Sequence, residues 1–231
     1  MPTAVDRILD GLIVSCQPVA GGPMDRLDMV IGFALAAEAG GAAALRIEGV
    51  ANVRGVRAVT RLPIIGIVKR VDPQTPVIIT ARLGDVADLA AAGADIIAFD
   101  ATDRVRPVAV SALAEGVRAA GCQSMADCAT LDDARRAAAA GIDVLGTTLS
   151  GYTGGPIPRG PDIDLVRRAA GIGRPVFAEG RYHTVVQVQA ARAAGAHAVV
   201  VGSAITRPEH ITSWFVEAVR SSGGGDHPPT R

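Results

Sequence analysis

Residues 63–80 read "PIIGIVKRVDPQTPVIIT" and contain two strand-like runs, 63–69 and 77–80. The spacer "RVDPQTP" (70–76) is too short and too rich in proline to hold the crossover helix that joins two parallel strands. We therefore expect 77–80 to be an extra extended segment in the loop that follows 63–69. This assignment decides how many strands the main sheet contains.

Eight strand candidates remain once 77–80 is set aside, and Ala-rich helical segments separate most of them. The strands are nearly continuous in apolar residues, as parallel strands buried on both faces should be. The strand candidates span 12–17, 43–49, 63–69, 96–102, 124–130, 144–151, 175–180 and 198–205. The helical candidates span 26–39, 50–60, 84–92, 107–120, 131–140, 161–170 and 184–194. Repeated strand–helix units predict an α/β fold, a single-domain (β/α)8 TIM barrel.

An open, doubly wound parallel sheet is the alternative fold. Such a sheet normally has a glycine-rich turn after its first strand, and "SCQPVAGG" (15–22) lacks the Gly-x-Gly-x-x-Gly spacing. We assign residues 1–220 to one barrel domain. We expect 221–231, "SSGGGDHPPTR", to be a disordered tail.

Composition excludes several classes of protein. The 231 residues include 23 basic and 23 acidic side chains, and only 3% are aromatic, which argues against nucleic-acid binding. The cysteines Cys16, Cys122 and Cys128 lack metal-type spacing, so we expect reduced thiols in a cytoplasmic protein. No signal peptide is recognisable, and no apolar run reaches the ~18 residues that a membrane span requires.

The carboxyl ends of the strands carry polar residues, and active sites of such barrels lie at that end. Lys69 and Glu179 each follow an unbroken apolar run, and two charges of opposite sign at the same end of two strands suggest a site. A single polar residue there could equally be a rim residue that contacts water or a loop. The other polar residues at these ends are Gln17, Arg46, Glu48, Asp100, Asp127, Thr147, Thr148, Ser150, Arg181 and Ser203.

Lys69 could act in two ways. As a general base it needs its pKa to fall from ~10.4 toward neutrality. Desolvation and the charge of Arg46 would lower that pKa, whereas a nearby Glu179 would raise it. As a nucleophile, Lys69 could instead form a Schiff base with a carbonyl substrate, as in barrel aldolases.

The turns after the last two strands predict a phosphate site. They contain Gly180 and Arg181 in "EGR", and Gly202 and Ser203 in "VGSAIT". Barrels commonly bind phosphate there, because small residues let backbone N–H groups approach the oxygens. The alternative is a pair of tight turns that need glycine. We expect a small phosphorylated substrate whose reacting centre lies toward Lys69.

We expect neither a metal nor another cofactor. None of the four histidines ends a strand, which argues against a His-rich metal centre. Asp100 and Asp127 could hold Mg²⁺ only through a phosphate. His183 follows the phosphate turn, and we expect it behind the site or on the surface.

The strand-end motifs together resemble the bacterial N-acetylmannosamine-6-phosphate 2-epimerase family. The resemblance extends from about residue 8 to about residue 217 and rests on motifs in the family's order. It implies a (β/α)8 barrel that interconverts N-acetylmannosamine 6-phosphate and N-acetylglucosamine 6-phosphate in sialic acid and amino-sugar catabolism. The motifs are "LIVSCQP", "GPMD", "ALRIEG", "PIIGIVKR", "ADIIAFDAT", "MADCAT", "GTTLSGYTG", "AEGRY" and "VGSAITRPEHI".

The resemblance also implies roles for individual residues. Lys69 would be the catalytic lysine and Glu179 its carboxylate partner. The sugar would be lined by Gln17, Arg46, Asp127 and Thr148, and the phosphate would lie at Arg181, Gly202 and Ser203.

The chain departs from the family pattern at His183, where we expect asparagine, and in the Gly/Pro-rich loop 154–162. Both departures concern specificity. A homodimer is possible. A Schiff-base aldolase and a non-catalytic phosphosugar-binding protein remain the alternatives.

Overall fold

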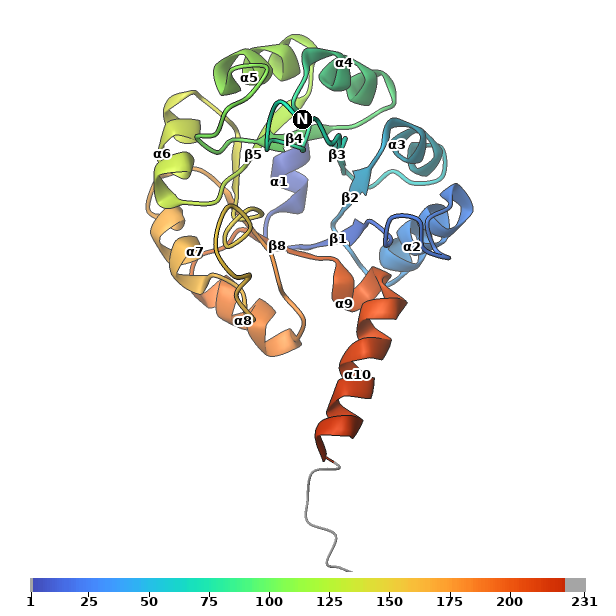
Figure 1. Cartoon of the computed structure of the whole chain (residues 1–231). Coiled ribbons are helices and arrows are strands. Elements are labelled where there is room, and N and C mark those ends of the chain that lie inside the picture. Colours follow the sequence, from blue (N-terminus) through green and yellow to red (C-terminus); the bar gives the residue numbers. More distant parts are fainter. Residues whose placement is uncertain (1, 223–231) are drawn as a thin grey trace, which may run out of the picture.

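The computed structural model describes residues 2–222 and contains one closed barrel of eight parallel strands (Figure 1). The strands pair in chain order, and the last is hydrogen-bonded to the first. This closure confirms the (β/α)8 barrel and excludes the open, doubly wound sheet. The strands are β1 (Leu12–Cys16), β2 (Ala44–Glu48), β3 (Ile64–Ile67), β4 (Ile96–Asp100), β5 (Gln123–Asp127), β6 (Val144–Gly146), β7 (Val176–Glu179) and β8 (Ala198–Val201).

Seven helices surround the barrel, one after each of the first seven strands (Figure 1). Several end on a glycine with positive φ, such as Gly93 (96°) and Gly195 (100°), in the left-handed region that glycine adopts without strain. At the start of α6, Thr130 and Asp133 form a reciprocal capping box. The helices are α2 (Leu27–Ala39), α3 (Val50–Arg57), α4 (Leu83–Ala91), α5 (Val110–Ala119), α6 (Leu131–Ala139), α7 (Ile163–Ala170) and α8 (Val185–Ala193).

Helix α1 (Ala4–Ile8), which the sequence did not predict, closes the amino end of the barrel. Its Val5 and Ile8 are buried in the same apolar cluster as Ile13 and Ile96 from the strands. The backbone N–H of Val5 donates to Oε1 of Gln123 at 2.9 Å. With that end closed, the site can open only at the carboxyl ends of the strands.

The segment 77–79 is extended and lies in the loop between β3 and α4, as the sequence predicted, whereas Thr80 has a left-handed φ of 43°. Ile79 pairs antiparallel with Lys69, and the N–H of Arg70 donates to the carbonyl of Ile78 at 2.9 Å. Thr80 donates its N–H to the carbonyl of Val68 at 2.8 Å. These bonds make the stretch 68–80 a hairpin, called here the β3 hairpin. The hairpin fixes the backbone of Lys69 where the strand ends.

The end of the described chain differs from the sequence-based expectation. Strand β8 stops at Val201, because 203–206 form the short helix α9 (Ser203–Thr206). Helix α10 (Pro208–Ser222) then projects away from the barrel (Figure 1) and includes two residues assigned to the disordered tail. The rest of that tail lies outside the described residues. Among the described helices, none is long and apolar enough to cross a membrane.

Candidate active site

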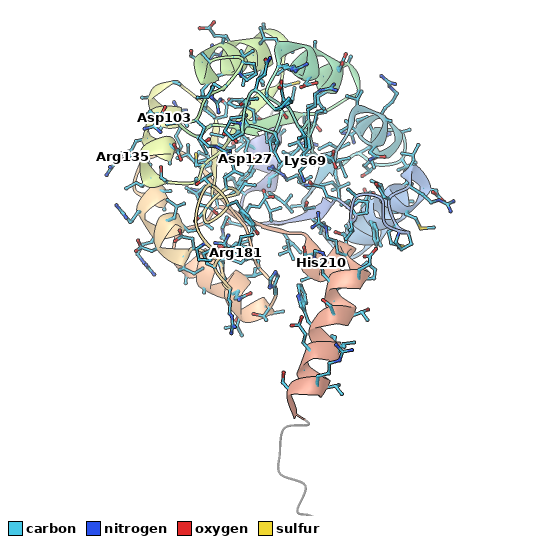
Figure 2. All side chains as sticks on the ribbon, in the orientation of Figure 1. Lys69, Asp103, Asp127, Arg135, Arg181 and His210 are labelled. Carbon is cyan, nitrogen blue, oxygen red and sulfur yellow. The ribbon has the colours of Figure 1, made fainter. Side chains whose placement is uncertain are left out.

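Two adjoining cavities open at the carboxyl end of the barrel and share five residues. The first, the β7/β8 cavity, has a volume of about 300 Å³, and the second, the β3/β6 cavity, about 360 Å³. Figure 2 shows Lys69 and Asp127 over the middle of the barrel, with Arg181 nearer the β7/β8 side. The shared residues are Gln17, Lys69, Thr148, Tyr152 and Glu179.

Lys69 lies at the junction of the two cavities. Its Nζ donates a hydrogen bond to Oε1 of Gln17 at 2.6 Å, and Nε2 of Gln17 donates to Oγ of Ser15 at 2.8 Å. Lys69 is also the only lysine in the chain, because the other 22 of its 23 basic residues are arginines. The placement of the sole lysine at the barrel mouth is a further indication, present in the sequence, that Lys69 belongs to the site.

The pKa of Lys69 is lowered, chiefly because surrounding protein atoms desolvate the ammonium group. The Lys69 side chain is nevertheless accessible to solvent through the open cavity. The positive charges of Arg46 and Arg207 lower the pKa further, while the carboxylates of Glu48 and Glu179 oppose the shift. A lysine whose pKa lies below its ordinary value holds more of the neutral amine that can accept a proton.

Glu179 faces the same junction but pairs with a different cation. Its Oε2 lies 3.1 Å from NH1 of Arg46 and accepts a hydrogen bond from Oγ1 of Thr148 at 3.2 Å. Burial, with the charge of Asp127 adding to it, raises the pKa of Glu179 to about 7, against the opposing effects of Arg46, Thr148 and Lys69. This carboxyl group can therefore both give and accept a proton near neutral pH.

Arg46 is held by a buried carboxylate. Its side chain is 1% exposed, and it makes two hydrogen bonds to Asp127, at 3.2 Å and 2.6 Å. Thr148 also donates to Asp127, at 2.6 Å. Asp127 is fully buried and lines neither cavity, and its contact with the sugar stays a prediction. Both of its oxygens are already engaged, and it positions Arg46 and Thr148.

The "EGR" turn after β7 has two successive residues in the left-handed region, Gly180 (φ 114°) and Arg181 (φ 62°). A positive φ at a non-glycine residue is strained, and such strain concentrates at functional sites. The turn places Arg181 against the loop after β6, where Nε donates to the carbonyl of Gly160 at 2.7 Å. Its guanidinium also lies 5.1 Å from the ring centre of Tyr152. Arg181 therefore both lines the β7/β8 cavity and anchors that loop.

Gly202 and Ser203 line the same cavity, beside Gly180 and Arg181. A Cβ on Gly202 would lie only 3.3 Å from Cβ of Ser15, so the close approach of β8 to β1 favours glycine there. All four residues predicted to form a phosphate site therefore line one cavity in the structure.

Three further residues of the β7/β8 cavity were not among the predicted site residues. Arg207 donates from Nε to the carbonyl of Gln17 at 2.7 Å, and Tyr152 borders both cavities. His183 was expected behind the site or on the surface; it is exposed, and it also lines the cavity and packs against Trp214 with ring centres 4.4 Å apart. The cationic residue that follows "SAIT" was the available signal for Arg207.

Asp100, the other carboxylate considered for magnesium, is fully buried and engaged by neighbouring groups. Arg104 and Arg106 both form ion pairs with it, and Thr102 donates to it. Within residues 2–222, no group of three or more His, Cys, Asp or Glu side chains is arranged to hold a metal ion.

The fold and the site together define a (β/α)8-barrel enzyme with a lysine and a carboxyl group, both of shifted pKa, at the barrel mouth. The family model NanE, described as "Putative N-acetylmannosamine-6-phosphate epimerase", matches residues 30–221. The chain belongs to this family.

Individual relatives agree with the family match. The chain is 50% identical over 221 residues to a "Putative N-acetylmannosamine-6-phosphate 2-epimerase" of Pasteurella multocida, covering 96% of this chain and 97% of that one. It is 52% identical over 225 residues to a bifunctional enzyme NanE/NanK of Brucella melitensis, covering 97% of this chain and 43% of the relative.

Solved structures resemble the barrel as well. The N-acetylmannosamine-6-phosphate 2-epimerase from Clostridium perfringens superposes with a TM-score of 0.91 at 37% identity, covering 94% of this chain and 96% of that one. A thiamine phosphate pyrophosphorylase from Pyrococcus furiosus, at 17% identity, has a TM-score of 0.61 and covers 94% and 99%. This second likeness shows the fold alone.

Proposed function

We propose that the protein interconverts N-acetylmannosamine 6-phosphate and N-acetylglucosamine 6-phosphate. The observation that carries the proposal is one cavity with proton-handling groups at one end and cations at the other. Lys69 and Glu179 stand at the first end, and Arg181 and Arg207 line the second. The family membership supports the same reaction.

The reaction inverts C2 of a 2-acetamido sugar, which requires removal of a weakly acidic proton beside a carbonyl. Lys69 accepts this proton as a neutral amine, a role that its lowered pKa and its hydrogen bond to Gln17 support. Glu179, with a pKa of about 7, orients the substrate or supplies a proton on the opposite face. Arg46 offsets the negative charge that develops in the enolate-like intermediate.

The phosphate group occupies the β7/β8 cavity in this proposal. Gly180, Gly202 and Ser203 are small enough for backbone N–H groups to approach the phosphate oxygens, and Arg181 and Arg207 supply positive charge. The reacting carbon then lies at the junction, beside Lys69.

Deuterium exchange tests the reaction and its mechanism together. The purified protein is incubated with N-acetylmannosamine 6-phosphate in deuterated water, and NMR follows C2. We expect the 2-epimer to form with deuterium at C2. Borohydride is added in a parallel sample, and mass spectrometry is expected to find no sugar adduct on Lys69.

Two outcomes would overturn the proposal. Absence of both epimerisation and exchange at C2 would leave the cavity as a phosphosugar-binding site without catalysis. A reduced sugar adduct on the sole lysine would move the protein to the Schiff-base aldolases.

The cellular setting follows from the same proposal. The protein acts in sialic acid and amino-sugar catabolism, and it works in the cytoplasm. The three cysteines support a reducing compartment, since all are free and Cys16 and Cys128 are buried.

A homodimer formed through α10 belongs to this proposal. Helix α10 has no buried residue in its described part, and it exposes Phe215 (71%) and Val219 (74%) on a helix that leaves the barrel (Figure 1). A lone helix of this length is marginal in water unless its apolar face is covered. A second copy of the chain is the commonest kind of partner.

A further inference from the structure

His183 borders the β7/β8 cavity, and the reaction proposed above gives it no role. It comes soon after Arg181 in the chain, and it lines the cavity together with Arg181 and Arg207. Within residues 2–222, neither nitrogen of its imidazole ring makes a hydrogen bond to another residue. Because a protonated imidazole donates from both nitrogens, the ring is suited to an anion in this cavity.

The position of the His183 ring is fixed by contacts of its backbone and of one ring face. The backbone N–H donates to Oε1 of Gln187 at 2.7 Å, beside the capping box of α8. The ring packs against Trp214 on α10, with the two ring planes 38° apart. A cation close to an aromatic ring is attracted to it, so this contact favours the protonated form of the imidazole.

The charges around the ring oppose its protonation unless an anion binds beside it. Partial burial lowers the pKa of His183, and the positive charges of His210 and Arg181 lower it further. These two residues lie on α10 and in the turn after β7 (Figure 2). The carboxylates of α10, Glu209 and Glu217, take no part in this shift, and the first turn of α8 carries no charge. The ring therefore stands among cations.

A phosphate dianion reverses this balance. Its two negative charges would offset the cations Arg181 and Arg207 that line the same cavity, and they favour a positive charge on His183. The protonated imidazole can then donate to a phosphate oxygen, which makes a charge-assisted hydrogen bond. Solvent can supply the proton, because His183 is exposed and the cavity is open.

We propose that His183 is a third phosphate ligand, beside Arg181 and Arg207, and that it takes up one proton from solvent when phosphate binds. This inference rests on the proposed function and adds a proton-linked step to substrate binding. The contribution of His183 to affinity is complete below the pKa of its ring in the free protein. It is lost as the pH rises through the pKa of the ring in the complex.

Trp214 provides a direct readout, because it is the only tryptophan in the sequence. A protonated imidazole in contact with an indole ring quenches its fluorescence, so the emission of Trp214 follows the charge on His183. The emission is measured from about pH 5 to pH 8, where histidine titrates, with and without saturating sodium sulfate. Sulfate resembles the phosphate dianion in shape and charge but does not itself titrate in this range.

We expect sulfate to raise the midpoint of the emission change by about one pH unit, which corresponds to about tenfold tighter binding of sulfate to the protonated ring. His183→Asn should remove this effect of sulfate. His210→Asn is the matched control, since His210 lies one helical turn before Trp214 on α10. The effect of sulfate on the midpoint should remain in this control.

Calorimetry measures the Kd of sulfate across the same pH range. Glu179 also lines the cavity and has a pKa of about 7, so its carboxylate repels sulfate more strongly as the pH rises. His183→Asn retains this repulsion. Between about pH 5 and pH 8, the Kd of the wild type should therefore rise by about tenfold more than that of the variant.

Three outcomes would overturn the role of His183. They are an equal effect of sulfate on the midpoint in the wild type and in His183→Asn, a loss of the effect in His210→Asn alone, and a failure of the wild type to bind sulfate. Sulfate binding does not depend on turnover. Absence of epimerisation would therefore contradict the proposed function without changing these measurements.

Discussion

Lys69 donates its short hydrogen bond to Gln17, at 2.6 Å, and not to Glu179, whose carboxylate pairs with Arg46 at 3.1 Å. The two strand-end charges of opposite sign therefore share a cavity without neutralising one another. A neutral amide leaves the lysine free to lose its proton, whereas a direct ion pair would hold the ammonium form. This arrangement is what a lysine base requires.

Replacement of Lys69 by alanine should lower kcat by ~10²–10⁴, because the base at C2 is lost. Lys69→Arg should lower kcat by a similar factor, since a guanidinium keeps the charge but does not release a proton near neutral pH. Steady-state kinetics measures both, and circular dichroism checks that the barrel is intact. Near-normal turnover in either variant would remove Lys69 from the proton transfer.

Glu179 should make the protein less stable as the pH rises. Its pKa is about 7 in the folded protein against an ordinary value of 4.5, so the folded state binds more protons between these limits. The free energy of unfolding therefore falls as the pH rises through this window. In Glu179→Gln this fall should be absent, and the variant should gain about 1–3 kcal/mol relative to the wild type between pH 5 and pH 7.

Urea unfolding at several pH values measures this difference. Glu115→Gln, which removes an exposed carboxylate on α5, is the control for the loss of a charge. Parallel stability curves for the wild type and Glu179→Gln would contradict a raised pKa at Glu179.

Removal of the buried carboxylate of Asp127 should be costly. Asp127→Ala should lower the free energy of unfolding by about 3–5 kcal/mol, because it leaves the buried Arg46 charge without its main partner. The paired replacement Arg46→Met with Asp127→Leu should recover most of that loss while remaining inactive. Chemical denaturation provides both values, and equal losses in the single and paired variants would argue against the ion pair as the cause.

Arg181→Ala should raise KM for the phosphorylated sugar more than it lowers kcat. A hydrogen bond to a charged group is worth about 1.5–3 kcal/mol, or roughly 10–150-fold in affinity when ground and transition states share it. Arg207→Ala should behave alike, since both side chains line the β7/β8 cavity.

The unphosphorylated sugar is the internal control for these arginines, and its poor turnover should hardly change. Arg135→Ala is the matched variant, since Arg135 lies on the outer rim of the barrel (Figure 2). An equal rise in KM for the phosphorylated and the unphosphorylated sugar would mean that these arginines do not bind the phosphate.

Phe215→Asp combined with Val219→Asp should convert the proposed dimer to a monomer, because charges replace the apolar face of α10. Sedimentation velocity measures the mass in solution. Val105→Asp is the control, since Val105 is 74% exposed in the loop after β4. A monomeric wild type, or an unchanged mass in the double variant, would contradict the dimer.

The barrel could be predicted because buried parallel strands leave a strong pattern of apolar runs at regular spacing. The proline-rich spacer 70–76 also showed that 77–80 is not a ninth barrel strand. Helix α1 escaped prediction because five residues are too few to show helical periodicity. The boundary at 203 was missed because "AVVVGSAI" reads as one apolar run although α9 begins within it.

Membership of the site was easier to predict than its contacts. Strand ends in a barrel must converge, so Lys69, Glu179 and Thr148 could be placed at one mouth from sequence. The hydrogen-bond partner of each side chain depends on the rotamers of residues that lie on strands far apart in the chain. Asp127 on β5 reaches Arg46 on β2, and no sequence spacing encodes that contact. Tyr152 was missed because it lies in a loop.

The single lysine makes this enzyme an unusual target for amine chemistry. Acylating reagents and dyes normally scatter over many surface lysines, but here Lys69 carries the only side-chain amine in the sequence. Apart from the α-amino group, all such label should converge on the junction of the two cavities. Bound sugar phosphate would shield it, so the extent of labelling would report occupancy directly. Coupling to an amine-reactive support would block the same position, and attachment through another group would be the better choice.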